Sequence, residues 1–217
     1  TLSSTETVNN DLYLFGGNVS SGGKVVGDLV VGGGNISVNG PVSQDLFVGG
    51  GSIAILSDVG DDLRVAGGNI SIAGKVGDDV VVAAGQTQIT GSVSGDVVWT
   101  GGALSVNAPV GGKMELTGGE VTINSHVSGD VKFSGQKLKL GKDAVIDGNL
   151  DYKAASEATV ETGAVVKGKT TYTELTTAKG SPISKTGLIA IISAFLLGKF
   201  LTALIFALVL GLAFKRF

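Results

Sequence analysis

A pattern of apolar and polar positions recurs every 17 residues between Val8 and about Asp143. Each of its eight units begins with a valine and carries an aspartate three residues later, except the seventh, which carries Lys113. The starting valines are Val8, Val25, Val42, Val59, Val76, Val93, Val110 and Val127, and the aspartates are Asp11, Asp28, Asp45, Asp62, Asp79, Asp96 and Asp130. Such self-similarity at a fixed period is typical of proteins built from stacked structural units.

Each unit has the form V-x-x-D-L-x-V-x-G-G-x-I-x-V-x-G-x, with two stretches in which apolar and other residues alternate. This alternation is the period of a strand with one buried face, and it excludes an amphipathic helix. Strands this short are stable when a coil of three such strands pairs in parallel with the next coil. The sequence therefore predicts an all-β fold, a parallel β-solenoid of about 17 residues per rung that covers residues 8–175, preceded by an N-terminal cap or tail at 1–7.

The spacing of the apolar positions favours a right-handed coil. Along one unit the spacings are 4, 2, 5, 2 and 4 residues, whereas the left-handed β-helix uses a hexapeptide repeat. Glycine contributes 36 residues, and Gly-Gly pairs recur at the same place in most units. We expect these pairs at the corners of the coil, where positive φ angles or close backbone approach call for glycine.

The charge and the cysteine content of the chain mainly exclude certain partners and sites. The formal net charge of -3 supplies no basic field, so nucleic acid is not expected as a partner. The chain has no cysteine, which excludes disulfides and cysteine-ligated zinc. No P-loop or Ser-His-Asp pattern occurs, and no cofactor is expected.

The period lengthens near the C-terminus, where the last rungs fit only with 19 to 20 residues each. Residues 176–186 contain the Gly, Ser and Pro of a linker. Residues 187–214 carry one charge and exceed the ~20 residues that cross a bilayer, so they predict a transmembrane helix. The basic tail 215–217 favours a cytoplasmic C-terminus, which places the solenoid on the extracytoplasmic side of the cell membrane; the cytoplasmic face is the alternative.

Lys199 is the one charge inside this apolar segment, where a lysine costs about 3 kcal/mol on insertion scales. Three interpretations stay open. The side chain snorkels from a tilted helix, it faces a neighbouring helix in an assembly, or it marks a break between two short helices.

The repeat units resemble the bactofilins, which are polymer-forming bacterial cytoskeletal proteins. The resemblance covers about residues 8–172 and is carried by the V-x-G-D-L and GGN-I-x-I-x-G units and by TVETGAVVKGKTTY at 159–172. It is closer to bactofilin-like membrane proteins with a secretory signal and a hydrophobic C-terminal region. The family implies a compact right-handed β-helix, end-to-end polymerisation without nucleotide, and a scaffolding role at the membrane. Typical bactofilins are cytoplasmic with a short N-terminal membrane tag, from which this chain departs.

The aspartate column is the strongest candidate for chemistry, because it is doubled on successive rungs by Asp61, Asp62, Asp78 and Asp79. We expect each carboxylate to accept backbone N–H groups of its own corner, as aspartate does in turns. Calcium bridging of neighbouring carboxylates is the alternative. No clustered acid, base and cation is evident, so no enzyme is predicted. His126 is expected on the surface, and Trp99 in the core.

An outward column between two core positions is mostly apolar over its first six rungs. The apolar members of this column are candidates for self-association: Tyr13, Val30, Phe47, Val81 and Val98. Arg64 occupies the same column between Phe47 and Val81. Half-buried corners are the alternative explanation.

These features predict a structural, membrane-anchored scaffold or filament subunit that polymerises with itself through solenoid ends or flanks. Open strand edges at the two terminal rungs would recruit further copies. The alternative is a monomeric adhesin or a β-helix that binds cell-envelope glycan.

Overall fold

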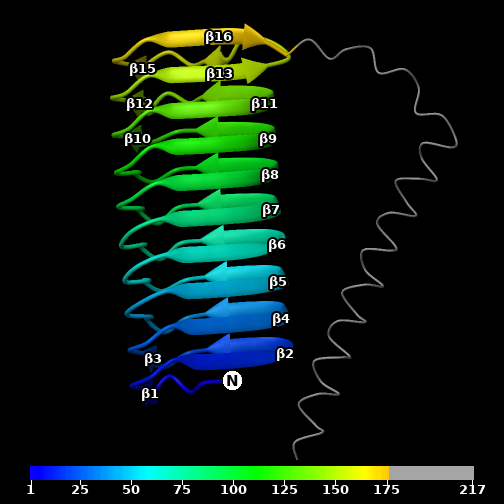
Figure 1. Ribbon diagram of the computed structural model, residues 1–217, viewed down its shortest axis with the longest axis vertical. Coiled ribbons are helices and arrows are strands. Elements are labelled where there is room, and N and C mark those ends of the chain that lie inside the picture. The colour runs from blue at the N-terminus through cyan, green and yellow to red at the C-terminus, as the bar shows by residue number, and fades with distance from the viewer. Residues whose placement is uncertain (176–217) are drawn as a thin grey trace, which may run out of the picture. The chain divides into compact units, whose positions relative to one another are not determined.

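The computed structural model describes residues 1–175; the predicted linker, transmembrane helix with Lys199 and basic tail lie outside the described residues. Within residues 1–175 no helix is long and apolar enough to cross a membrane. This part of the chain is a parallel β-solenoid of about 10 turns (Figure 1). The predicted all-β class and the repeat of about 17 residues per turn are therefore confirmed.

Most rungs contribute one strand of 10 residues, and the remaining strands are shorter. The ten-residue strands are β2 (Leu12–Ser21), β4 (Leu29–Val38), β5 (Leu46–Ile55), β6 (Leu63–Ile72), β7 (Val80–Ile89), β8 (Val97–Val106), β9 (Met114–Ile123) and β11 (Val131–Leu140). Two five-residue strands, β13 (Leu150–Ala154) and β16 (Thr170–Glu174), follow them. The two-residue strands are β1 (Thr7–Val8), β3 (Lys24–Val25), β10 (His126–Val127), β12 (Val145–Ile146), β14 (Thr159–Val160) and β15 (Val165–Val166).

Each long strand pairs in parallel with its copies in the adjacent rungs, in the order β16-β13-β11-β9-β8-β7-β6-β5-β4-β2. The register places equivalent residues of the repeat side by side, for example Leu29 beside Leu46. Toward the C-terminus the offset grows: Val131 pairs with Leu150, and Leu150 pairs with Thr170. These offsets of 19 and 20 residues confirm the predicted lengthening of the last rungs.

The expectation of three separate short strands per coil needs one correction. A single strand runs through both alternating stretches and across the glycine pair, as Leu29–Val38 does. The third side of the coil is held by isolated parallel bridges between corner valines, such as Val25 with Val42 and Val42 with Val59. The glycine pair thus bends the strand without ending its hydrogen-bonded ladder.

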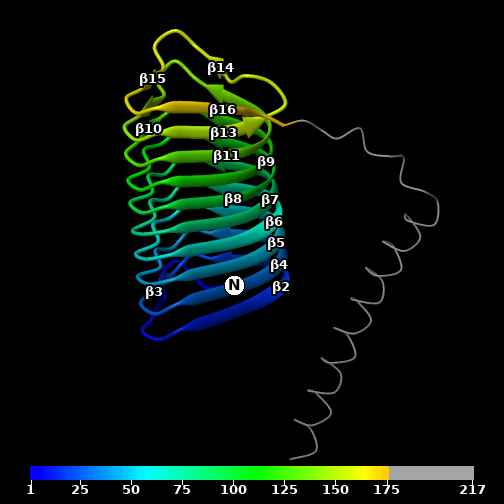
Figure 2. The same ribbon diagram turned by 45° about the horizontal axis from the view of Figure 1, so that its top comes forward.

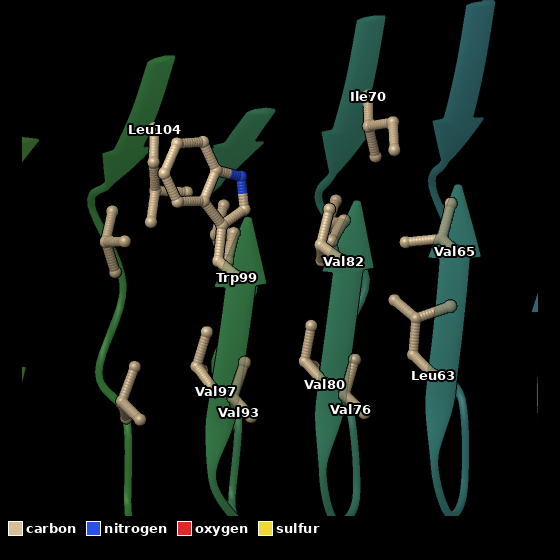
Figure 3. Packing of buried hydrophobic residues seen from close by; sticks show 14 of the residues in the cluster. Leu63, Val65, Ile70, Val76, Val80, Val82, Val93, Val97, Trp99 and Leu104 are labelled. Atoms are coloured by element: carbon tan, nitrogen blue, oxygen red, sulfur yellow. The ribbon is translucent and has the colours of Figure 1, made fainter. Parts of the chain in front are cut away.

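The core is a set of parallel apolar columns inside the coil. In one unit Val25, Leu29, Val31, Ile36 and Val38 are all buried, which confirms the inward positions assigned from the spacing. Equivalent side chains of successive rungs lie over one another, as Leu63, Val80 and Val97 do (Figure 3). Stacking like on like gives every rung the same close packing with its neighbours.

The glycine pairs are needed for close approach and not, in general, for positive φ. Among the described residues positive φ occurs only at Gly118 and Gly163, and only Gly163, at +109°, is clearly in the left-handed region. A Cβ on Gly50 would lie 2.6 Å from the carbonyl oxygen of Gly33 in the preceding rung, which a side chain cannot accept without displacement. The stacked carbonyls therefore select glycine.

Candidate interaction surfaces

The N-terminal end of the stack is an open strand edge. Within residues 1–175, β2 has β4 on one side and no partner strand on the other. The N–H of Leu12 donates to the carbonyl of Asp28 (2.8 Å), so the N–H of Tyr13, which points the opposite way, faces the open side. Side chains at this edge are apolar: Leu12 and Leu14 are half-buried, and Tyr13 is 63% exposed.

The predicted cap or tail at 1–7 lies against only the last part of this edge. The N–H of Leu2 donates to the carbonyl of Ser20 (2.9 Å), and the N–H of Gly22 donates to the carbonyl of Leu2 (2.8 Å). β1 then pairs with β3 at the next corner. Among the described residues, none pairs through its backbone with the edge from Leu12 to Asn18 on that side.

The C-terminal end is open in the same way. In the described chain β14, β15 and β16 each pair with one strand only, namely β11, β12 and β13. Figure 2 shows these three strands as the last layer of the stack. Val160 is 58% and Val165 47% exposed, while the ring of Tyr172 stacks on Tyr152 with centroids 5.1 Å apart. Within residues 1–175, both ends of the solenoid therefore present unpaired edges flanked by apolar side chains.

The register brings the predicted self-association residues together on one face. Tyr13 pairs with Val30, Val30 with Phe47, and Val81 with Val98, with Arg64 between the two groups. Tyr13, Val81 and Val98 are exposed, while Val30 and Phe47 are half-buried. We call this column of six residues, including Arg64, the apolar flank. Further along the same column Glu115, Lys132 and Asp151 make it charged.

A groove of small residues runs beside the apolar flank. Gly49, Ala66, Ala83 and Thr100 line it, together with flank residues from Val30 to Val98. The guanidinium carbon of Arg64 lies 5.3 Å from the centroid of the Phe47 ring, so the one charge in the flank packs on an aromatic face. The flank side chains therefore line one side of this groove.

Phe15 extends the apolar surface and was not identified from the sequence. It is 73% exposed and opens a column whose next members are Gly32 and Gly49. A Cβ on Gly32 would lie 2.7 Å from Cδ1 of Phe15, so the missing side chain of Gly32 leaves room for the ring. The available signal was a lone aromatic residue in a column of small ones.

The aspartate column forms a hydrogen-bonded ladder between rungs. The N–H of each aspartate from Asp28 to Asp96 donates to Oδ1 of the aspartate one rung earlier, with N···O distances of 2.7–3.1 Å. The expectation that each carboxylate binds its own corner is therefore wrong, because the N–H that it accepts belongs to the next coil. The N–H of Lys113 donates in the same way to Oδ1 of Asp96 at 2.9 Å, but the lysine side chain has no oxygen to accept the next N–H.

The structure brings together three of the four predicted acidic residues. Carboxylate oxygens of Asp61, Asp62 and Asp78 lie within 4.8 Å of one another. The charge of Asp79, then partial desolvation and the charges of Asp62 and Asp61, raise the pKa of Asp78. Oδ1 of Asp62 accepts the N–H of Asp79 (3.0 Å), and its Oδ2 accepts Arg64 Nη2 (2.7 Å). Calcium binding here stays a prediction, and the oxygens of Asp62 already have protein partners.

His126 and Trp99 lie where the sequence placed them. His126 is exposed at a corner, with Nε2 2.9 Å from Oδ2 of Asp147. A hydrogen bond from Lys167, followed by that from His126, lowers the pKa of Asp147. Trp99 is buried, and its Nε1 donates to Oγ1 of Thr87 at 3.0 Å. The indole projects into the core beside Val82 and Leu104 (Figure 3).

A second groove crosses the second half of strands β5 to β9, and its lining combines apolar residues with polar, mostly uncharged side chains. Its lining includes Ser52, Asn69, Gln86, Gln88 and Ser105. It offers hydrogen-bond donors and acceptors in regular rows, without an exposed aromatic ring.

Searches of protein families, curated proteins and solved structures found no match to this chain. The class defined by the fold is thus the parallel β-solenoid repeat protein.

Proposed function

We propose that this protein is a structural subunit that assembles with itself into a filament or surface scaffold, as the resemblance to bactofilins implies. The observation that carries the proposal is the pair of open strand edges, β2 at one end and β14 to β16 at the other. Unpaired parallel edges with apolar side chains recruit further strands unless they are covered. A solenoid with two such ends forms open-ended polymers, because each added copy exposes a new edge.

The apolar flank supports side-by-side contact between such polymers. Its length is limited to six rungs, or about 30 Å at the strand spacing of parallel sheets. One column of side chains over this length buries less than the ~800 Å² per partner of a stable protein interface. Lateral contact is therefore weak for one copy and strong for a filament that repeats it.

We also propose that the coil is right-handed and that residues 187–214 anchor it in the cell membrane, with the solenoid on the extracytoplasmic side. Neither nucleotide nor cofactor has a role in this assembly, and no catalytic activity is proposed. The partners are further copies of the chain and the lipid bilayer.

The test is sedimentation and electron microscopy of the full chain in detergent without nucleotide. We expect a pelleted fraction that rises with protein concentration and contains filaments. Tyr13→Pro removes an open-edge N–H without removing a bond between β2 and β4, so it should lower the affinity between copies about tenfold or more, about 1.4 kcal/mol for each junction.

Tyr13→Ala is the matched control, because it removes the same side chain but keeps the N–H. Circular dichroism of both variants should match the unaltered chain. Protein that stays monomeric at all concentrations, or equal assembly by the Pro and Ala variants, would contradict association through this edge.

The alternative function, a monomeric glycan-binding rod, is favoured by the second groove, which Asn69, Gln86 and Gln88 help to line. Amide side chains in rows can donate to and accept from sugar hydroxyls. Single rods that bind cell-envelope glycan would select this alternative.

A further inference from the structure

The first corner of the solenoid has the same size as the last two and differs from those in the middle. In the regular rungs the end of a long strand and the following corner valine are four residues apart, as with Val38 and Val42. The strand pairing places three further pairs of residues in the same two columns as Val38 and Val42: Leu2 and Val8, Leu140 and Ile146, and Val160 and Val166. The two residues of each of these pairs are six residues apart.

The three enlarged corners also contain the same hydrogen-bonded turn. The N–H of Glu6 donates to the carbonyl of Ser3 at 3.1 Å. The N–H of Ala144 donates to the carbonyl of Gly141 at 3.0 Å, and that of Ala164 donates to the carbonyl of Glu161 at 3.1 Å. In each case the acceptor directly follows the paired residue before the corner, which is Leu2, Leu140 or Val160, and the donor lies three residues beyond the acceptor.

The two ends also match in winding phase. Continuous pairing places Leu2 in the column that ends at Val160, and Val8 in the column that ends at Val166. Leu12 likewise begins the column that ends at Thr170. Leu2 and Val160 are therefore a whole number of turns apart, as are Val8 and Val166, so the N-terminal corner is in phase with the C-terminal one.

We infer that copies of this chain join head to tail in the register of the internal rungs, which gives the filament a polarity. Leu2, Val8 and Leu12 of one copy stack on Val160, Val166 and Thr170 of the preceding copy. This rests on the proposed function, and it selects one of the possible junctions. A junction between two like ends requires antiparallel pairing, whereas every pairing within residues 1–175 is parallel.

Side-chain chemistry at this junction follows that inside the solenoid. Leu14 falls in the column of Tyr172, so its half-buried side chain covers the open face of that ring. Asp11 falls in the column of Lys169, which places opposite charges in adjacent rungs. The same column already brings Lys113 Nζ to 3.7 Å from Oδ2 of Asp96. Apolar and charged positions both find complementary neighbours.

Cysteine cross-linking tests the register, because the chain has no cysteine of its own. The junction places Tyr13 beside Thr171 of the preceding copy, at the ~4.8 Å spacing of neighbouring strands. This falls within the 4.4–6.8 Å range of Cα separations about a disulfide. Full-length chain carrying both Tyr13→Cys and Thr171→Cys should form a ladder of dimers, trimers and larger covalent species on oxidation.

The matched control combines Tyr13→Cys with Asp151→Cys, which moves the second thiol one rung inward to about twice the strand spacing. It should give no ladder, and neither single variant should form dimers. Dimers from Tyr13→Cys alone or Thr171→Cys alone would show that like ends meet and would overturn the inference. Filaments seen by electron microscopy without a ladder would also overturn it while leaving the proposed function standing; an absence of filaments would overturn both.

Discussion

The backbone N–H of Asp45 donates to the carboxylate of Asp28 in the preceding rung, with 3.1 Å between nitrogen and Oδ1. The same bond recurs along the column, and near the C-terminus the side-chain amide oxygen of Asn149 accepts the N–H of Lys169 at 2.9 Å. The bond therefore needs an oxygen and not a negative charge. It explains why aspartate recurs at a position that packs no apolar surface.

Replacing Asp28 by alanine should lower the free energy of unfolding by about 1–2 kcal/mol, because the N–H of Asp45 loses its acceptor. Asp28→Asn keeps an oxygen in the same place and should change stability by less than about 0.5 kcal/mol. Urea denaturation followed by circular dichroism measures both. Equal losses for the two variants would mean that the charge, and not the hydrogen bond, is what matters.

Asp78 should make stability depend on pH in the opposite sense to a salt-bridged carboxylate. Its pKa is raised above the ordinary value of 3.8, first by the charge of Asp79. Between pH 3.8 and the raised pKa, the folded state therefore holds a proton that the unfolded state has lost. Stability therefore falls as pH rises from 3.8 through the raised pKa. Asp78→Asn should stabilise the protein at pH 7, and the gain should vanish below pH 3.8.

Thermal melting between pH 3 and pH 8 measures this effect. Asp151→Asn is the control, since Asp151 pairs in register with Lys132 and not with another carboxylate. It should bring no gain at neutral pH. A variant at Asp78 that is less stable at pH 7 would contradict the repulsion, and a loss seen only with calcium present would support the calcium alternative.

The hydrogen bond between Trp99 and Thr87 should contribute more to the free energy of unfolding than the exposed side-chain hydrogen bonds do, because both residues are buried. Thr87→Val keeps the volume but leaves the indole N–H without an acceptor, at a cost of about 1–3 kcal/mol. In a Trp99→Phe background the same change should cost almost nothing, and a double-mutant cycle by chemical denaturation gives the coupling. A cost that persists in that background would assign the effect to packing.

The apolar flank should govern bundling and not filament growth. Val81→Lys together with Val98→Lys places charges on the exposed flank, so filaments should separate into single threads in electron micrographs. Glu115→Lys with Lys132→Glu, in the charged part of the same column, is the control and should leave bundles intact. Bundles that survive the first pair of changes would contradict lateral contact through this face.

The sequence predicted the fold well because one period controlled every inward position. The apolar positions of Val25, Leu29 and Ile36 recur at the same spacing, with Thr87 as the one polar residue in these three columns, and columns of buried residues follow directly from parallel stacking. The lengthened last rungs were also visible, as a shift in the phase of the repeat. Such regularity leaves few other ways to bury the apolar residues.

The sequence was less informative wherever a contact joined different rungs or departed from the period. The ladder bond from Asp45 to Asp28 joins residues 17 positions apart and cannot be distinguished from a local turn by spacing. The turn from Ser3 to Glu6 has no sequence in common with that from Glu161 to Ala164, although their hydrogen bonds agree. Only the register shows that these two corners belong to the same column.

The most direct test of the account is electron cryomicroscopy of filaments formed by the full chain without nucleotide. Because strands stack along the solenoid, open-ended stacking predicts a repeat of about 4.8 Å along the filament axis, continuous through the junctions. The image transforms should show this spacing on the meridian. Filaments in which that spacing lies across the axis, or protein that remains as separate short rods, would contradict it.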